Sequence, residues 1–402
     1  MTEANTGAPE KMRLAVVVPR YGRDLWGGAE LHGRWLAHRL AGAGHAVDVL
    51  TTCATNHWSW ANDLPPGVET DGSVRVVRFR ATARDLGIHG ELDRALFIGF
   101  TLSRDEELLW LRHGGSSEEM EDHLRAHRGD YDAVLALPYL FGTTYFAYAA
   151  CPSNTVLIPC LHDEAFAYLG FVKEMLTGAA GIFFNTDAEA TLAKRICPDL
   201  APWGVVGAGL DLPDRSMFRP RSGPPSILYV GRREGGKNSH VLTDYFLHYK
   251  SRKKNDLVLK FAGSGDPVPK RRDIIELDRD LDSGPFEVFA ESAIVCQPSI
   301  NESLSIVLLE GWGAMRPALV NGACDVTRQH CERSNGGLWF SSYAEFEEAV
   351  DKLIGSRRLA ETLGMNGRNY VEREYSWEAV LDRFDNAMQH VLESRASVSA
   401  GA

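Results

Sequence analysis

The stretch NESLSIVLLE, residues 301–310, follows the aliphatic run SAIVCQP at 292–298 and leads into the apolar sequence GWGA. A short aliphatic run, a polar break and a longer apolar segment predict a buried strand, a loop and a helix. The stretch carries two glutamates, Glu302 and Glu310, and eight positions along one helix would turn them about 80° apart. If Glu302 instead lies in a loop before a helix capped near Ser303, both carboxylates can lie at one edge of a sheet.

The same alternation of aliphatic runs and amphipathic segments extends from this stretch in both directions. Runs that do not alternate with polar residues predict strands that are buried on both faces of a sheet. In the second half these runs are SILYVG (226–231), LVLKFAG (257–263) and PALVN (317–321). In the first half they are LAVVVP (14–19), AVDVLTT (46–52), VRVVRF (74–79), DAVLALP (132–138), TVLIP (155–159) and GIFFN (181–185). The predicted fold class is therefore α/β, with doubly wound parallel sheets.

A chain of 402 residues exceeds the usual size of one hydrophobic core, so two domains are expected. The segment GLDLPDRSMFRPRSGPP (209–225) is rich in proline, glycine and arginine and has no period, which is typical of a linker. We predict a disordered tail at 1–10, an N-terminal domain at 11–210 and a C-terminal domain at 211–375. We expect a helix at 376–402 to pack back toward the N-terminal domain.

Charge and composition exclude several classes of protein. A formal net charge of −11 argues against sequence-independent binding of nucleic acid, which needs a basic face. No apolar run approaches the roughly 20 residues of a transmembrane helix, although peripheral contact with a membrane stays open. The seven cysteines are odd in number and scattered, as in a protein with reduced thiols. We therefore expect a cytoplasmic protein.

Two loops that follow strands combine glycine with charged residues. Ligands of open parallel sheets bind beyond the carboxyl ends of the strands, where the N-termini of helices point. Gly27 and Gly28 precede a helical segment, and paired glycines let backbone N–H groups approach a phosphate, although a plain tight turn is the alternative. Arg232 and Lys237 flank two glycines after the strand at 226–231, and both side chains bind phosphate oxygens well. Two solvated loop cations are the alternative there.

The acidic and histidine candidates suit a ligand with hydroxyl groups. A carboxylate in an apolar run, such as Glu310, is costly to bury without a partner, and ribose hydroxyls would be suitable partners. The alternative is a buried ion pair with Glu302 as a surface acid. His162 follows the strand at 155–159 and could donate to a sugar hydroxyl, oriented by the neighbouring Asp163; a structural histidine beside a capping acid is the alternative. Cations for a diphosphate and acids for hydroxyls together indicate a nucleotide-sugar site.

At the level of whole motifs, the chain resembles the retaining glycosyltransferases of family 4, which have the GT-B architecture of two facing Rossmann-like domains. The segment LYVGRREGGKN (228–238) is similar to the strand, glycine, arginine and lysine element of that family. The segment QPSINESLSIVLLEGWGAMRPALV (297–320) is similar to its block of two glutamates separated by seven residues. GGAE at 27–30 is similar to its glycine-rich loop.

The resemblance implies a role for each matching residue. Arg232 and Lys237 would hold the donor diphosphate, Glu302 would lie beside the donor sugar, and Glu310 would bind the ribose. His162 would lie against the transferred sugar, so that the residues expected to act in catalysis are Glu302, His162, Arg232 and Lys237. The remaining residues expected to bind the donor are Gly27, Gly28, Gly231, Gly263, Ser303, Leu304 and Ser305. Where the family usually has Gly-Phe-Gly after the first glutamate, this chain has Ser303-Leu304-Ser305.

The implied activity is transfer of a hexose-type sugar from a nucleotide diphosphate sugar, with a UDP-sugar favoured, to an acceptor hydroxyl. Retention of anomeric configuration is implied, with no metal and no cofactor besides the donor substrate. The expected acceptor is a small molecule, a natural product or a glycan, and a homodimer is left open. Two alternatives stay open: an epimerase-type GT-B enzyme, and a non-catalytic protein that binds nucleotide sugars.

Overall fold

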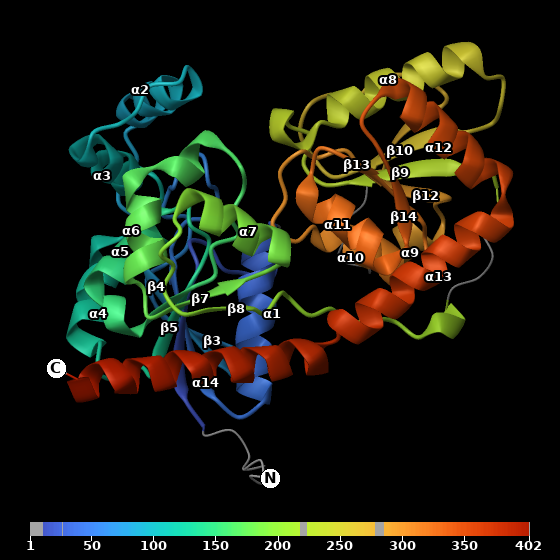
Figure 1. The fold of residues 1–402 in the computed structure, drawn as a ribbon. Helices are drawn as coiled ribbons and strands as arrows, with labels where there is room; N and C mark the ends of the chain where they lie inside the picture. Colours follow the sequence, from blue (N-terminus) through green and yellow to red (C-terminus); the bar gives the residue numbers. More distant parts are fainter. Residues whose placement is uncertain (1–10, 26, 218–222, 278–284, 402) are drawn as a thin grey trace, which may run out of the picture. The chain divides into compact units, whose positions relative to one another are not determined.

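The computed structural model describes residues 11–25, 27–217, 223–277 and 285–401 (Figure 1). The predicted tail at 1–10 and part of the predicted linker, 218–222, lie outside these residues. The chain divides into two compact units, here called unit 1 (Met1–Ala208 with Leu381–Ala402) and unit 2 (Gly209–Val380). The sequence placed these divisions at 210 and 375. Within the described residues, no helix is both long enough and apolar enough to cross a membrane.

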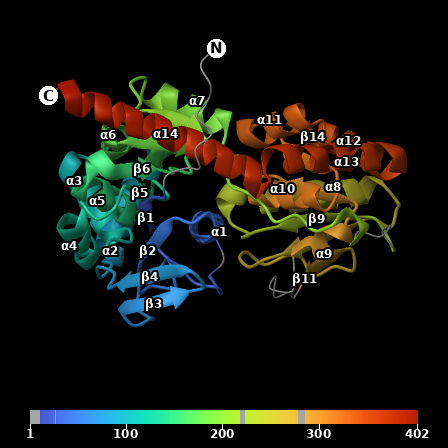
Figure 2. The same ribbon diagram turned by 90° about the horizontal axis from the view of Figure 1, so that it is seen from below.

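Unit 1 contains an eight-stranded sheet in the order β3-β4-β2-β1-β5-β6-β7-β8. All pairs are parallel except β3 with β4, which form an antiparallel hairpin. Helices α1 and α5 lie on opposite faces of this sheet (Figure 2). The strands are β1 (Arg13–Val17), β2 (Ala46–Thr52), β3 (Gly67–Asp71), β4 (Val74–Phe79), β5 (Ala133–Ala136), β6 (Thr155–Leu157), β7 (Gly181–Phe184) and β8 (Trp203–Val205).

In unit 1, helix α1 covers the helical segment that was predicted after Gly27 and Gly28. The helices of this unit are α1 (Gly28–Gly42), α2 (Leu86–Phe97), α3 (Arg104–His113), α4 (Glu118–His127), α5 (Gly142–Ala150), α6 (Gly170–Gly178) and α7 (Asp187–Ile196). Helix α14 (Trp377–Gly401) begins in unit 2, and its residues from Leu381 onward belong to unit 1. Phe384 packs edge-on against Phe183 of β7, with ring centroids 5.5 Å apart. A side chain at Gly181 would collide with Val391, so this glycine lets the helix approach the sheet.

Unit 2 contains a six-stranded, wholly parallel sheet in the order β11-β10-β9-β12-β13-β14. The order reverses at β9, which pairs with β10 on one side and β12 on the other, and such a switch point creates a crevice at the carboxyl ends of the strands. The strands are β9 (Ser226–Val230), β10 (Val258–Ala262), β11 (Ile274–Leu277), β12 (Ile294–Gln297), β13 (Ala318–Asn321) and β14 (Gly337–Phe340). The helices are α8 (Ser239–Arg252), α9 (Pro285–Ala290), α10 (Ile306–Gly313), α11 (Asp325–Ser334), α12 (Tyr343–Gly355) and α13 (Arg357–Glu374).

Candidate functional site

Lys237 and Glu302 form an ion pair at the carboxyl ends of β9 and β12. Lys237 ends the short 3-10 helix η4 (Gly235–Lys237), and Glu302 lies in the loop between β12 and α10. The lysine Nζ is 2.8 Å from the glutamate Oε1, and the two side chains are 25% and 9% exposed. The structure thus joins a cation and a carboxylate that stand 65 residues apart in the sequence. Each of these groups could exchange its partner for a group of a bound ligand.

Glu310 occupies the apolar helix α10, three residues before its end. The helix begins at Ile306 with Ser305 at its cap, so the cap lies two residues later than the predicted position near Ser303. Glu302 therefore lies outside the helix. Within the described residues, no hydrogen bond or ion pair to the Glu310 carboxylate is found, and burial raises its pKa to about 8. The alternative of a buried ion pair at Glu310 does not hold for the described residues.

The loops after β9 and β10 touch each other through glycines. Gly231 has φ 139° and Gly263 has φ 118°, both of which favour glycine. A side chain at Gly263 would collide with the carbonyl oxygen of Gly231, so this close approach also requires glycine. The two predicted donor-binding glycines therefore lie against each other at the carboxyl ends of β9 and β10.

Arg232 and Arg233 have opposite environments although they are adjacent. The side chain of Arg232 is 52% exposed and lies 3.2 Å from a carboxylate oxygen of Glu234, so its guanidinium is accessible to a ligand. The side chain of Arg233 is 5% exposed and pairs with Glu276. It also donates to the carbonyl oxygens of Gly263 and, at 2.6 Å, Asp266. Sequence reasoning did not single out Arg233, which joins the two loops.

The segment Ser303-Leu304-Ser305 is buried, and its backbone contacts the side chain of His330. The carbonyl oxygen of Leu304 lies 3.1 Å from Nε2 of His330, whose Nδ1 lies 3.0 Å from the hydroxyl of Tyr370. His330 can satisfy both contacts as a neutral ring that donates from Nε2 and accepts at Nδ1. Ser305 has φ 64° and ψ 68°, in the left-handed region, at the position where the related motif has its second glycine. The loop thus keeps a backbone shape that glycine would adopt without strain.

In unit 1, Gly27 and Gly28 form the start of α1. Glu30, in the first turn of that helix, pairs with the side chain of Arg20. A side chain at Gly27 would collide with the Glu30 carboxylate, whereas a side chain at Gly28 would meet nothing. Glu30 therefore has a structural partner, and only the first of the two glycines is required by local packing.

His162 lies in the loop after β6. Its Nδ1 is 3.7 Å from an Oε1 of Glu164, too far for a good hydrogen bond in this state. The prediction that Asp163 orients the histidine is wrong, because Asp163 pairs with Arg195 and accepts a hydrogen bond from Tyr168 at 2.7 Å. Glu164 is the neighbouring acid instead, and it accepts a hydrogen bond from Tyr139 at 2.7 Å.

Glu189 on α7 supports the loop that carries His162. Its buried carboxylate accepts hydrogen bonds from the backbone N–H groups of Leu161 at 2.6 Å and Asn185 at 2.5 Å. Burial raises its pKa to about 8. Sequence reasoning missed this residue. Its only signal is an acid three positions after Thr186, a pattern typical of the start of a helix.

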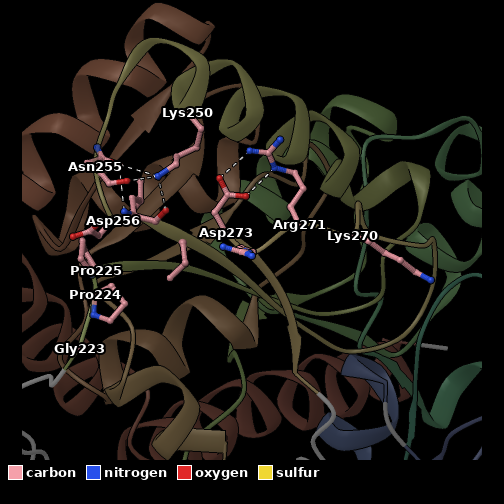
Figure 3. Close-up of a pocket in the computed structure, with 12 residues that line it drawn as sticks. Gly223, Pro224, Pro225, Lys250, Asn255, Asp256, Lys270, Arg271 and Asp273 are labelled. Atoms are coloured by element: carbon pink, nitrogen blue, oxygen red, sulfur yellow. Dashed lines mark hydrogen bonds and ion pairs between the residues drawn. The ribbon is translucent and has the colours of Figure 1, made fainter.

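A cavity of about 1120 Å³ lies at the opposite edge of the unit 2 sheet, before the strands β9, β10 and β11 begin. In Figure 3, Lys250 turns toward Asn255 and Arg271 turns toward Asp273, whereas Lys270 points away from both pairs. Lys250 donates to the carbonyl oxygen of Leu257 at 3.1 Å, and Arg271 pairs with Asp273 at 2.8 Å. This cavity includes none of the predicted site residues. In the described part of the chain, no cluster of three or more His, Cys, Asp or Glu could hold a metal ion.

The chain is similar to known proteins in sequence. Residues 214–370, all in unit 2, match the family described as glycosyl transferases group 1. An uncharacterized glycosyltransferase of Methanocaldococcus jannaschii is 22% identical, and the match covers 95% of this chain and 99% of that protein.

Solved structures share the fold at low sequence identity. Sucrose-phosphate synthase from Thermosynechococcus elongatus has a TM-score of 0.70 and 15% identity, covering 97% of this chain and 100% of that one. HepE of Anabaena, solved with UDP and glucose, has a TM-score of 0.62 and 14% identity, covering 94% and 99%. The predicted α/β fold class of GT-B type is confirmed. The fold and the family match together support a glycosyltransferase of the GT-B type.

Proposed function

We propose that this protein is a retaining, metal-independent glycosyltransferase that moves a hexose-type sugar from a UDP-sugar to an acceptor hydroxyl. The observation that carries the proposal is the ion pair of Lys237 with Glu302 at the switch point of the unit 2 sheet, inside the segment that matches the group 1 family. UDP is favoured because related structures were solved with UDP and glucose or with UDP-2-fluoro glucose.

Unit 2 would bind the donor. We assign the diphosphate to Arg232 and Lys237 and to the backbone around Gly231 and Gly263, because cations and N–H groups suit phosphate oxygens. Glu302 would accept hydrogen bonds from hydroxyls of the sugar. Glu310 would accept them from the ribose, which would give its half-buried carboxylate the partner it lacks among the described residues.

Catalysis would depend on electrostatic stabilisation of the leaving group. Negative charge grows on the diphosphate as the glycosidic bond breaks. Arg232 and Lys237 would therefore stabilise the transition state more than the ground state. A phosphate oxygen of the leaving group would take the proton of the acceptor hydroxyl, which attacks from the same face and retains the configuration. Unit 1 would contribute the acceptor site.

The first experiment measures donor binding and turnover. Purified protein is titrated with UDP and UDP-glucose by calorimetry, and release of UDP is followed with a panel of small-molecule and glycan acceptors. Lys237→Ala and Glu310→Ala should each weaken UDP binding about tenfold or more, since each removes a hydrogen-bonding partner of the ligand. Lys253→Ala is the matched control, because Lys253 belongs to the same unit and pairs with Asp351 at 2.7 Å.

Equal UDP affinity of both site variants and the control would overturn the site assignment. Retention is tested by NMR of the product anomer, and metal independence by turnover that persists in EDTA. The serine at 305 motivates one alternative, a donor-binding protein without transferase activity. Tight binding of UDP-glucose without turnover on any acceptor would establish that alternative, whereas an altered sugar nucleotide without acceptor would indicate an epimerase.

The cysteines bear on where such an enzyme would work. All seven are free thiols, and five of them are buried. Reduced thiols persist in a reducing compartment, so we propose a cytoplasmic enzyme. Fractionation of cells that express the tagged protein tests this placement.

A further inference from the structure

The side chain of Gln297 is buried beside the Glu302 carboxylate with only one end satisfied. Gln297 ends β12 and is 4% exposed. Its Nε2 donates to Oε1 of Glu302 at 3.1 Å and lies 3.4 Å from the hydroxyl oxygen of Ser305. Its Oε1 has no hydrogen-bond partner within the described part of the chain. A buried acceptor without a partner costs about 1–3 kcal/mol. Gln297 therefore lowers the stability of the folded protein at the end of an otherwise apolar strand.

Ser305 adds a second cost at the same place. Its left-handed backbone, with φ 64°, strains any residue that has a side chain. Left-handed residues other than glycine also stand beside two more site segments: Cys160 lies two positions before His162, and Asn238 directly follows Lys237. Local rules of folding are broken most often where a function needs the resulting geometry. Two such violations meet at the amide of Gln297, which contacts both Ser305 and Glu302.

We propose that Gln297 and Ser305 position the Glu302 carboxylate for the donor sugar. The inference rests on the proposed function. Lys237 shares Oε1 of Glu302 with Gln297, and a bound diphosphate would draw the lysine toward its own negative charge. The amide N–H of Gln297 then still holds the carboxylate, as a neutral donor that a diphosphate does not attract. An ionised carboxylate only accepts hydrogen bonds, so the amide must turn its nitrogen, and not its oxygen, toward Glu302.

The decisive variant is Gln297→Leu, which keeps the volume and removes both ends of the amide. Affinity for UDP should stay within twofold of the parent, because free UDP lacks the sugar. Affinity for UDP-glucose and kcat/KM should fall about tenfold or more, as expected when a charged hydrogen bond is lost. The melting temperature should stay equal or rise, because the unpartnered oxygen is gone.

Ser226→Ala is the matched control. Ser226 lies at the amino-terminal end of β9, a central strand of the same sheet, whereas the site lies at the carboxyl ends of the strands. Its buried hydroxyl also has no partner among the described residues. Its replacement should likewise keep or raise the melting temperature, but should leave both affinities and kcat/KM unchanged.

Gln297→Glu provides a signature that a packing role would not give. At high pH the new carboxylate repels Glu302 and activity should be low. As the pH falls, the like charge keeps one proton on the pair, the protonated acid again donates to Glu302, and activity relative to the parent at the same pH should recover. This recovery should be absent in Gln297→Leu.

The possible outcomes separate this inference from the proposed function. If the parent protein turns over UDP-glucose and Gln297→Leu does so with unchanged kcat/KM, the positioning role is wrong while the function stands. Equal loss of UDP and UDP-glucose affinity would also overturn it, because it indicates general damage to the site. A Gln297→Glu activity without acid recovery overturns it even if Gln297→Leu does not fold. If the parent binds neither ligand, the proposed function itself fails.

Discussion

At the scale of single residues, Gly27 and Gly28 show how two neighbouring glycines differ. Gly27→Ala should lower the free energy of unfolding by about 1–3 kcal/mol, because the new methyl group displaces Glu30 from Arg20 and leaves buried polar groups unpaired. Gly28→Ala should change it by less than about 0.5 kcal/mol, since nothing lies near the added carbon. Urea denaturation of both variants measures the difference, and an equal effect of the two would contradict it.

Glu310 makes stability depend on pH. Burial raises its pKa in the folded protein to about 8, above the value of 4.5 expected when unfolded. The folded state therefore binds the extra proton between these values, and the stabilising effect present at low pH is lost as the pH rises through 8. Glu310→Gln should flatten this dependence and gain most over the parent near pH 8. Melting curves at pH 5 and 8 test the difference between the two proteins, because Glu189 adds a change of the same sign to both.

At the scale of elements, the loops after β9 and β10 depend on Arg233. Arg233→Ala should lower the free energy of unfolding by about 1–3 kcal/mol, because the carbonyl oxygens of Gly263 and Asp266 lose a buried donor. Arg232→Ala should cost less than about 0.5 kcal/mol, because its side chain is half exposed. For UDP binding we expect the opposite order. Arg232→Ala should weaken binding more than Arg233→Ala, because it removes the proposed contact with the diphosphate. Calorimetry and denaturation of the same two proteins check both halves.

The aliphatic runs predicted most strands because a strand buried on both faces must be apolar throughout. The strands that were not predicted carry a different pattern. β3 reads GVETD and is exposed along most of its length, so only its hairpin with β4 makes it a strand. β11, IIEL, is exposed at its two central residues, β14, GLWF, has its tryptophan partly exposed, and β8 has only three residues.

The site was predictable only where a residue type carries its own chemistry. Lys237, Glu302 and Glu310 stand out because charges are rare beside apolar strands, and the structure pairs the first two. Their roles toward a donor stay predictions. Arg233 and Glu189 could not be found, because each acts through hydrogen bonds to partners far away in the sequence. Gln297 lies only five residues before its partner Glu302, but the contact depends on how the loop between them folds back.

At the scale of the whole molecule, the end of the chain belongs to the core of unit 1. Phe384, Met388 and Val391 of α14 are almost fully buried. Truncation of the chain after Val380 should therefore lower the free energy of unfolding of unit 1 by on the order of 5 kcal/mol. A chain that stops at Ala396 keeps these three side chains and should melt like the parent. Differential scanning calorimetry of both truncations tests this, and a normal melting curve for the shorter chain would contradict it.

The two chain segments that lead into and out of unit 2 lie next to each other. Leu210 forms an isolated parallel bridge with Ser376, and its N–H donates to the carbonyl oxygen of Tyr375 at 2.8 Å. Topologically, Gly209–Val380 is thus an insertion whose entrance and exit are adjacent, so it can be cut out and replaced without reconnecting distant points. A homologous cassette grafted between Ala208 and Leu381 would transplant the donor preference that we propose for unit 2 while leaving unit 1 untouched.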